Sequence, residues 1–138
     1  MGRSDVAQRD LARAVAAVDR ELAANLELTS MFDQTKQAFV LENGQWQLHR
    51  SKIAGELPSA HAFVEDLYRR IPDAESAMER RGPANSLKDE DREIVEAWEG
   101  DAREVQRRLR ADLEQPEPPI PVRLLRLIAR LFGRWARS

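Results

Sequence analysis

The last nineteen residues, from Ile120 to Ser138, constrain this chain more than any other stretch. On a helical wheel at about 100° per residue, five arginines fall within about 80° of one another, and seven large apolar residues cover the opposite side. The arginines are Arg123, Arg126, Arg130, Arg134 and Arg137, and the apolar residues are Leu124, Leu125, Leu127, Ile128, Leu131, Phe132 and Trp135. No acidic residue follows Glu117. A narrow cationic stripe beside a broad apolar face is typical of a helix that lies in a membrane interface.

The charge balance separates this tail from the rest of the chain. Residues 1–119 carry 17 basic and 24 acidic side chains, a net charge of −7, because five of the 22 basic residues fall in the tail. A body this acidic is a poor nucleic-acid binder, since neutralisation of phosphates supplies most non-specific affinity. The absence of cysteine excludes disulfides, cysteine-ligated zinc and thiol catalysis.

Membrane targeting by an apolar segment is not expected. Arg3, Asp5, Arg9 and Asp10 interrupt any apolar core of a secretory signal. No stretch reaches the roughly 20 apolar residues that span a bilayer, since the tail has an arginine every three or four positions. We therefore expect a cytoplasmic protein that reaches the inner face of the membrane without crossing it.

A long first helix should begin near Ser4 or Asp5, either of which can cap it. Its expected seam shows alternating spacings of four and three: Leu11, Val15, Val18, Leu22, Asn25, Thr29 and Phe32. Asn25 is the polar member of this seam, and we interpret it as a buried residue that fixes helix register. The alternative is a functional role shared with Glu21, one turn earlier on the same face.

The stretch from Phe39 to Leu57 allows two interpretations. Asn43-Gly44 between two apolar runs is a hairpin signal. The spacing of Trp46, His49, Ile53 and Leu57 instead indicates a helical face, with Gly44 as the residue that ends the first helix. We favour the helix, because an isolated hairpin is marginally stable. In either case Phe39 and Trp46 should close one end of the bundle.

Two further helices are expected before the linker. Pro58 suits the first turn of a helix with the buried face Ala60, Phe63, Val64, Leu67, Tyr68 and Ile71, which Pro72 should bend or end before a continuation over 73–81. Gly82-Pro83 is a stop, and Ser86 should cap a helix over Leu87–Gln115. The seam of that last helix is Ile94, Trp98, Ala102, Val105, Leu109 and Leu113.

Four prolines between Pro116 and Pro121 forbid helix and favour a semi-rigid polyproline spacer of about 19 Å. The sequence thus predicts an all-α up-down bundle of three to four helices over 4–115, a Pro-rich linker over 116–121 and a basic amphipathic helix over 122–138.

Residues suited to catalysis or cofactor binding are few. The chain has no phosphate-binding glycine loop, zinc-binding His-Glu motif or nucleophile elbow. His61 and Glu65 lie one helical turn apart, but two side chains do not make a metal site, and we expect a surface or partly buried histidine. Trp46 and Trp98 should be core residues. We expect no cofactor and no enzymatic activity.

One set of residues resembles a recurrent pattern. Glu21-x-x-x-Asn25-Leu26, then Phe39, Trp46, and Leu67-Tyr68 with Ile71, are similar to a pattern over about residues 18–72 of small, membrane-anchored bacterial helical proteins. The resemblance implies a bacterial protein with a membrane anchor and implies no activity. Those proteins usually carry an N-terminal transmembrane helix. Here that end is charged, so the resemblance places the anchor at the C-terminus.

We therefore expect a peripheral membrane-associated interaction or scaffold protein. Its predicted membrane- or partner-binding residues are Arg123, Leu124, Arg126, Leu127, Ile128, Arg130, Leu131, Phe132, Arg134, Trp135 and Arg137. The alternative is a soluble bundle whose last helix folds back, pairs in a homodimer or docks into a groove of a protein partner. Burying seven large apolar side chains contributes on the order of 10–20 kcal/mol before ordering costs, so the tail needs some partner surface.

Overall fold

The computed structural model describes residues 4–35, 39–80 and 87–114, without the side chains of Asp33 and Gln34. These residues form five helices: α1 (Asp5–Thr35), α2 (Gly44–Glu56), α3 (Pro58–Arg69), α4 (Ile71–Glu79) and α5 (Asp89–Glu114). The predicted all-α helical bundle is confirmed.

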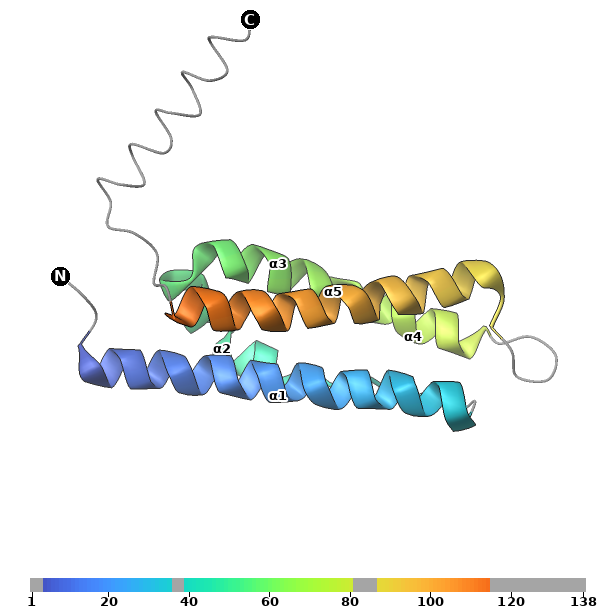
Figure 1. Cartoon of the computed structure of the whole chain (residues 1–138), viewed down its shortest axis with the longest axis horizontal. Coiled ribbons are helices and arrows are strands. Elements are labelled where there is room, and N and C mark those ends of the chain that lie inside the picture. The colour runs from blue at the N-terminus through green and yellow to red at the C-terminus, as the bar shows by residue number, and fades with distance from the viewer. Residues whose placement is uncertain (1–3, 36–38, 81–86, 115–138) are drawn as a thin grey trace, which may run out of the picture.

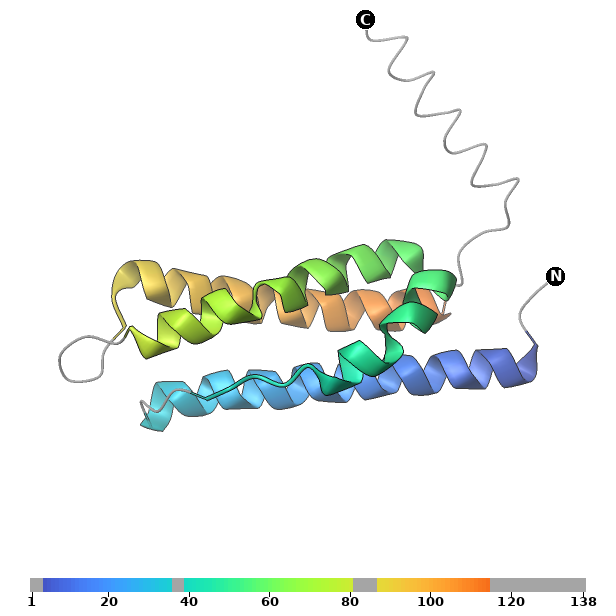
Figure 2. The same cartoon turned by 180° about the vertical axis from the view of Figure 1, so that it is seen from behind.

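The helices make antiparallel passes along one axis (Figures 1 and 2). Helix α1 runs the length of the bundle, and α5 runs antiparallel to it. The extended residues 39–43 and α2 return along α1, and α3 and α4 together form one bent rod that packs on α5. The start of α1 and the end of α5 lie at the same end of the bundle.

Local sequence explains most helix boundaries. The Ser4 hydroxyl accepts a hydrogen bond from the Ala7 N–H at 3.1 Å, so the predicted cap of the first helix is confirmed. Pro58 opens α3 as predicted, and Pro72 stands in the first turn of α4, where its missing N–H does no harm. At this break the Trp98 indole N–H donates to the Leu67 carbonyl oxygen at 3.0 Å. Tryptophan from α5 thus supplies a donor at the kink between α3 and α4.

Two clusters of buried side chains fill the interior. The main cluster joins all five helices, and its largest members include Leu11, Leu22, Trp46, Leu67 and Trp98. The second cluster lies toward the end of the bundle where α1 ends and α5 begins, and it contains Phe32, Ala77, Met78 and Val95, with Phe39 and Leu87 packed against it. Trp46 and Trp98 are each 1% exposed, which confirms both as core residues.

The prediction that Gly44 ends the first helix is wrong. Residues 44–56 are helical, as favoured, but α1 ends at Thr35 and Gly44 is the first residue of α2. Residues 39–43 are extended because side chains of α1 and α4 bind their backbone, as described below. This extended stretch also separates Phe39 from Trp46, so the two do not close one end of the bundle together: they belong to different clusters.

The predictions that Phe63 and Ile94 are core residues are also wrong. Phe63 is 49% exposed, with the Arg108 guanidinium 4.0 Å from its ring centroid, since α3 turns Val64 and Leu67 inward instead. Ile94 is 37% exposed, because Val95 occupies the seam of α5 one position later. That helix begins at Asp89 in the structure, two residues after the predicted start, and the predicted cap Ser86 lies outside the described residues.

Candidate functional site

The predicted membrane-binding residues and the Pro-rich linker lie outside the described residues. Within the described part of the chain, polar side chains gather on one face of α1. Glu21, Asn25 and Thr29 follow one another at four-residue spacing, and each is at most 5% exposed. We call these three residues the α1 polar ladder. The burial of an acid, an amide and a hydroxyl in one row requires a partner for each, because unpaired buried polar groups are costly.

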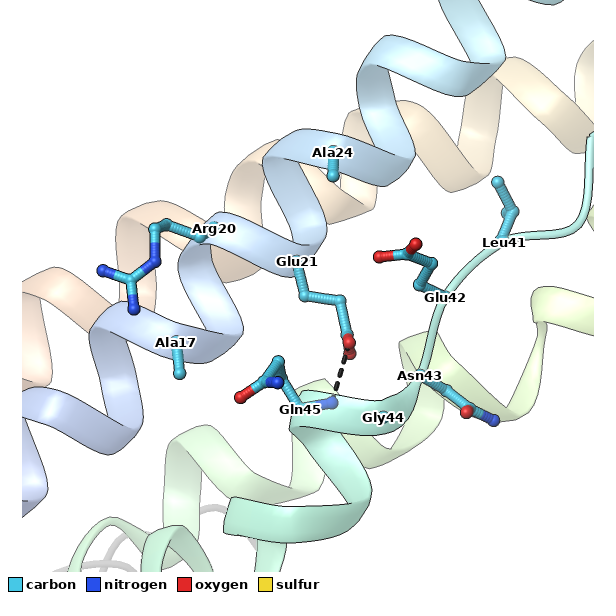
Figure 3. A pocket seen from close by; sticks show the side chains of 9 residues that line it. All are labelled: Ala17, Arg20, Glu21, Ala24, Leu41, Glu42, Asn43, Gly44 and Gln45. Atoms are coloured by element: carbon cyan, nitrogen blue, oxygen red, sulfur yellow. Dashed lines mark hydrogen bonds between the residues drawn. The ribbon is translucent and has the colours of Figure 1, made fainter.

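Glu21 caps α2 from outside that helix. Its carboxylate accepts hydrogen bonds from the Gln45 N–H at 2.7 Å and the Trp46 N–H at 3.1 Å, two of the free donors of the first turn. Asn43, at the usual capping position, makes no side-chain cap bond, and its side chain points away from Glu21 in Figure 3. The negative charge also meets the positive end of the α2 dipole. A residue 23 positions earlier than the start of α2 therefore fixes where that helix begins.

Asn25 and Glu75 bind the backbone of the extended residues that precede α2. The Asn25 amide donates to the Glu42 carbonyl oxygen at 2.8 Å, and its own oxygen accepts the Glu42 N–H at 2.7 Å. The Glu75 carboxylate, from α4, accepts the Leu41 N–H at 2.8 Å. Asn25 thus pairs with both backbone groups of one residue, Glu42, as a neighbouring strand would. The prediction that Asn25 is buried is confirmed, and its side chain binds the backbone of Glu42, while its role in helix register stays a prediction.

An aromatic stack connects this cluster to α3. The Tyr68 hydroxyl donates to the Glu21 carboxylate at 2.9 Å, and its ring stacks on Trp46 with centroids 5.5 Å apart. Burial, followed by the charge of Glu21 and the hydrogen bond to it, raises the pKa of Tyr68 well above its ordinary value of 10.0. Tyr68 therefore stays a neutral donor across the whole physiological range. With Gln45 and Trp46, it gives the buried Glu21 carboxylate three hydrogen-bond donors.

Glu65 and His61, both on α3, also contact Trp46. The Trp46 indole N–H donates to the Glu65 carboxylate at 3.2 Å, and Arg50 lies 3.3 Å from the same group. The His61 and Trp46 ring centroids are 5.3 Å apart, and the His61 Nε2 atom lies 3.9 Å from the Glu65 carboxylate. The His61 side chain is 25% exposed, so it is a partly buried histidine, as expected. Among the described residues, no three histidine, cysteine, aspartate or glutamate side chains are placed to hold a metal ion.

An open groove of about 620 Å³ borders Glu21, the first residue of the α1 polar ladder (Figure 3). Its walls are α1 and the chain from Leu41 to Gln45, and its lining residues are Ala17, Arg20, Glu21, Ala24, Leu41, Glu42, Asn43, Gly44 and Gln45. None of these is a serine, threonine, cysteine, histidine, lysine or tyrosine, so the groove has no nucleophile beside a base. Its buried acid, Glu21, is already committed to three structural hydrogen bonds.

No family model, curated protein or solved structure matches this chain. The resemblance to small membrane-anchored bacterial helical proteins therefore stays a prediction. Four residues that carry it, Glu21, Asn25, Trp46 and Tyr68, meet in the one cluster that positions residues 41–46. A helix that could cross a bilayer is not found in the part of the chain that the structure describes.

Sequence reasoning missed two acidic members of this architecture. Glu75 binds the Leu41 backbone, and Glu99 accepts a hydrogen bond from Thr29 at 2.7 Å, which connects the polar ladder to α5. Helical periodicity could not reveal either, because both positions look like ordinary solvated acids. The available signal was Thr29, whose hydroxyl in an apolar seam needs a polar partner, either a carbonyl of its own helix or a side chain of a facing helix.

Proposed function

We propose that this chain is a non-enzymatic interaction or scaffold protein at the cytoplasmic face of a membrane. Its acidic bundle would be attached to anionic lipid through the arginine-striped C-terminal segment. The observation that carries the proposal is the segregation in that segment: five arginines on one side, seven large apolar residues on the other, and no acid after Glu117.

The construction of the bundle supports this proposal. The main buried cluster contains residues from each of α1–α5, so the described helices form a core with one another. The buried polar side chains Glu21, Asn25 and Thr29 act on the protein's own backbone or side chains. A groove whose one buried acid is occupied in this way favours a scaffold over an enzyme.

Vesicle binding by the full chain tests the proposal. Vesicles of phosphatidylcholine and phosphatidylglycerol in equal amounts should co-sediment the protein at low salt, and added salt should weaken but not abolish binding, since the apolar face is not screened. Each arginine near an anionic surface contributes roughly 1 kcal/mol, so replacing Arg126, Arg130 and Arg134 with glutamine should weaken binding on the order of 100-fold. The matched control replaces three exposed arginines of the bundle, Arg9, Arg13 and Arg103, with glutamine and should bind almost as the parent does.

The competing arrangements give different results. A tail that folds back or pairs in a dimer would leave the full chain in the supernatant at low salt, and Leu127→Glu with Leu131→Glu would then lower the melting temperature or dissociate the dimer. Under the proposal the same double variant loses vesicle binding and keeps the melting temperature of the bundle.

A further inference from the structure

Contacts across the bundle show which residues lie at the same height along its long axis. Thr29 of α1 bonds Glu99 of α5, and farther along, the Gln106 side chain donates to the Asp19 carbonyl oxygen at 3.1 Å. The ion pair between Arg70 and Asp101, at 2.7 Å, places the α3–α4 junction at the height of Asp101. A plane at the height of the Arg70–Asp101 pair, between the other two levels, divides the described body into a proximal half (residues 4–26, 42–70 and 102–114) and a distal half (27–35, 39–41, 71–80 and 87–101).

All of the body's net charge lies in the distal half. The stretches of the proximal half carry 11 acidic and 11 basic residues, a net charge of 0. The described stretches of the distal half carry 12 acidic and 3 basic residues, a net charge of −9. Exposed acids such as Glu79, Glu93 and Glu96 contribute to this excess.

The tail follows α5 at the end of the bundle that has no net charge. Helix α5 ends at Glu114, at the outer limit of the proximal half, and the start of α1 lies at the same end (Figure 1). The start of α5 lies at the opposite end, beside the end of α4. The chain therefore leads into its cationic segment from the one end of the bundle that an anionic surface does not repel.

From this arrangement we infer that the bundle stands on the membrane on its proximal end, with the distal half pointing away from the lipid. The inference rests on the proposed function and adds the membrane-facing surface and the orientation of the body. A body lying flat would bring the distal acids within the Debye length of an anionic surface, about 8 Å at physiological salt, where they are repelled. In the upright orientation the proximal part of α5, thirteen residues from Ala102 to Glu114, raises the distal half about 20 Å above the membrane-facing end and out of that layer.

The absence of native cysteine allows a direct measurement on the full chain. Arg110→Cys and Glu90→Cys place single thiols at exposed positions of α5, twenty residues or about 30 Å apart. Each variant carries a donor fluorophore, and the vesicles contain a headgroup-labelled acceptor lipid with phosphatidylglycerol. Energy transfer should be several-fold more efficient from position 110 than from position 90.

A pair of charge-reversed proteins separates electrostatics from tethering. Changing Glu79, Glu93 and Glu96 to lysine brings the described distal half from −9 to −3, and the body should then tilt until the two positions transfer energy about equally. The matched control makes the same change in charge in the proximal half, with Asp5, Asp10 and Glu104 changed to lysine, and should remain upright. Circular-dichroism melts confirm that each variant is folded.

The outcomes are distinct. Equal transfer from both positions in the bound parent protein overturns the orientation and leaves the proposed function intact. Unequal transfer that survives distal charge reversal overturns the electrostatic cause, because the tether alone would then orient the body. A parent protein that does not bind the vesicles overturns both.

Discussion

Glu21→Gln tests whether one buried carboxylate determines where α2 begins. Glu21 is 5% exposed and accepts hydrogen bonds from two backbone N–H groups of α2 and from the Tyr68 hydroxyl. Glutamine has nearly the same shape, but one of its two terminal atoms is an NH₂ donor. In the variant at least one of these three buried donors would therefore face another donor.

The expected cost follows from these contacts. A buried donor left without a partner costs about 1–3 kcal/mol, and the remaining bonds lose about 1 kcal/mol each when the acceptor is no longer charged. Relief from burying a charge offsets part of this loss. We expect the free energy of unfolding to fall by about 2–4 kcal/mol, a large share of the 5–15 kcal/mol typical of a domain.

Urea unfolding followed by far-ultraviolet circular dichroism measures the effect. With a slope of about 1–3 kcal/mol per molar urea, the midpoint should fall by about 1–2 M. Glu27→Gln is the control, because Glu27 is exposed on the same helix and its replacement should change stability by less than about 0.5 kcal/mol. If both variants unfold at the same urea concentration as the parent, Glu21 does not cap α2 in the manner described.

Two further predictions concern the same cluster. Tyr68 is the only tyrosine, so tyrosinate absorbance at alkaline pH reports this residue alone. Because the pKa of Tyr68 is raised in the folded state, its contribution to stability is full below the ordinary pKa near 10.0 and is lost as the pH rises above it. We therefore expect tyrosinate to appear only when the protein unfolds. Tyrosinate that forms at the ordinary pKa in the folded protein would contradict the buried hydrogen bond. Asn25→Leu should lower the unfolding free energy by about 2–4 kcal/mol, because the Glu42 N–H and carbonyl both lose their partner, whereas the exposed control Ser30→Ala should unfold as the parent does. A leucine variant as stable as the parent would mean that Asn25 only fixes register.

The sequence predicted most of the helical architecture because the relevant signals are local. Ser4, Pro58 and Pro72 act through their own backbone or the adjoining turn, so the boundaries that they set were correct. Apolar spacing likewise identified Leu11 and Trp98 as core residues. A helical wheel was less accurate at the margins of a face, where Phe63 and Ile94 turned out to be exposed, since neighbouring helices decide which side of a broad stripe is covered.

The course of the chain between α1 and α2 was decided by tertiary structure. Asn43-Gly44 is compatible with a hairpin, a helix end or a helix start, and local propensity does not choose among them. The choice is made by Glu21, Asn25 and Glu75, whose side chains reach the backbone of residues 41–46 from 17 to 34 positions away in the sequence. Sequence by itself marked Asn25 as a buried polar residue and set apart a cationic, amphipathic C-terminal segment. Only the tertiary structure brings the carboxylates of Glu21 and Glu75 to the backbone N–H groups that they bind, because every backbone N–H is chemically alike and the local sequence does not indicate which distant side chain will reach it. The separation of the net charge into one half of the bundle has the same origin, since antiparallel packing places the end of α1 beside α4 and the start of α5.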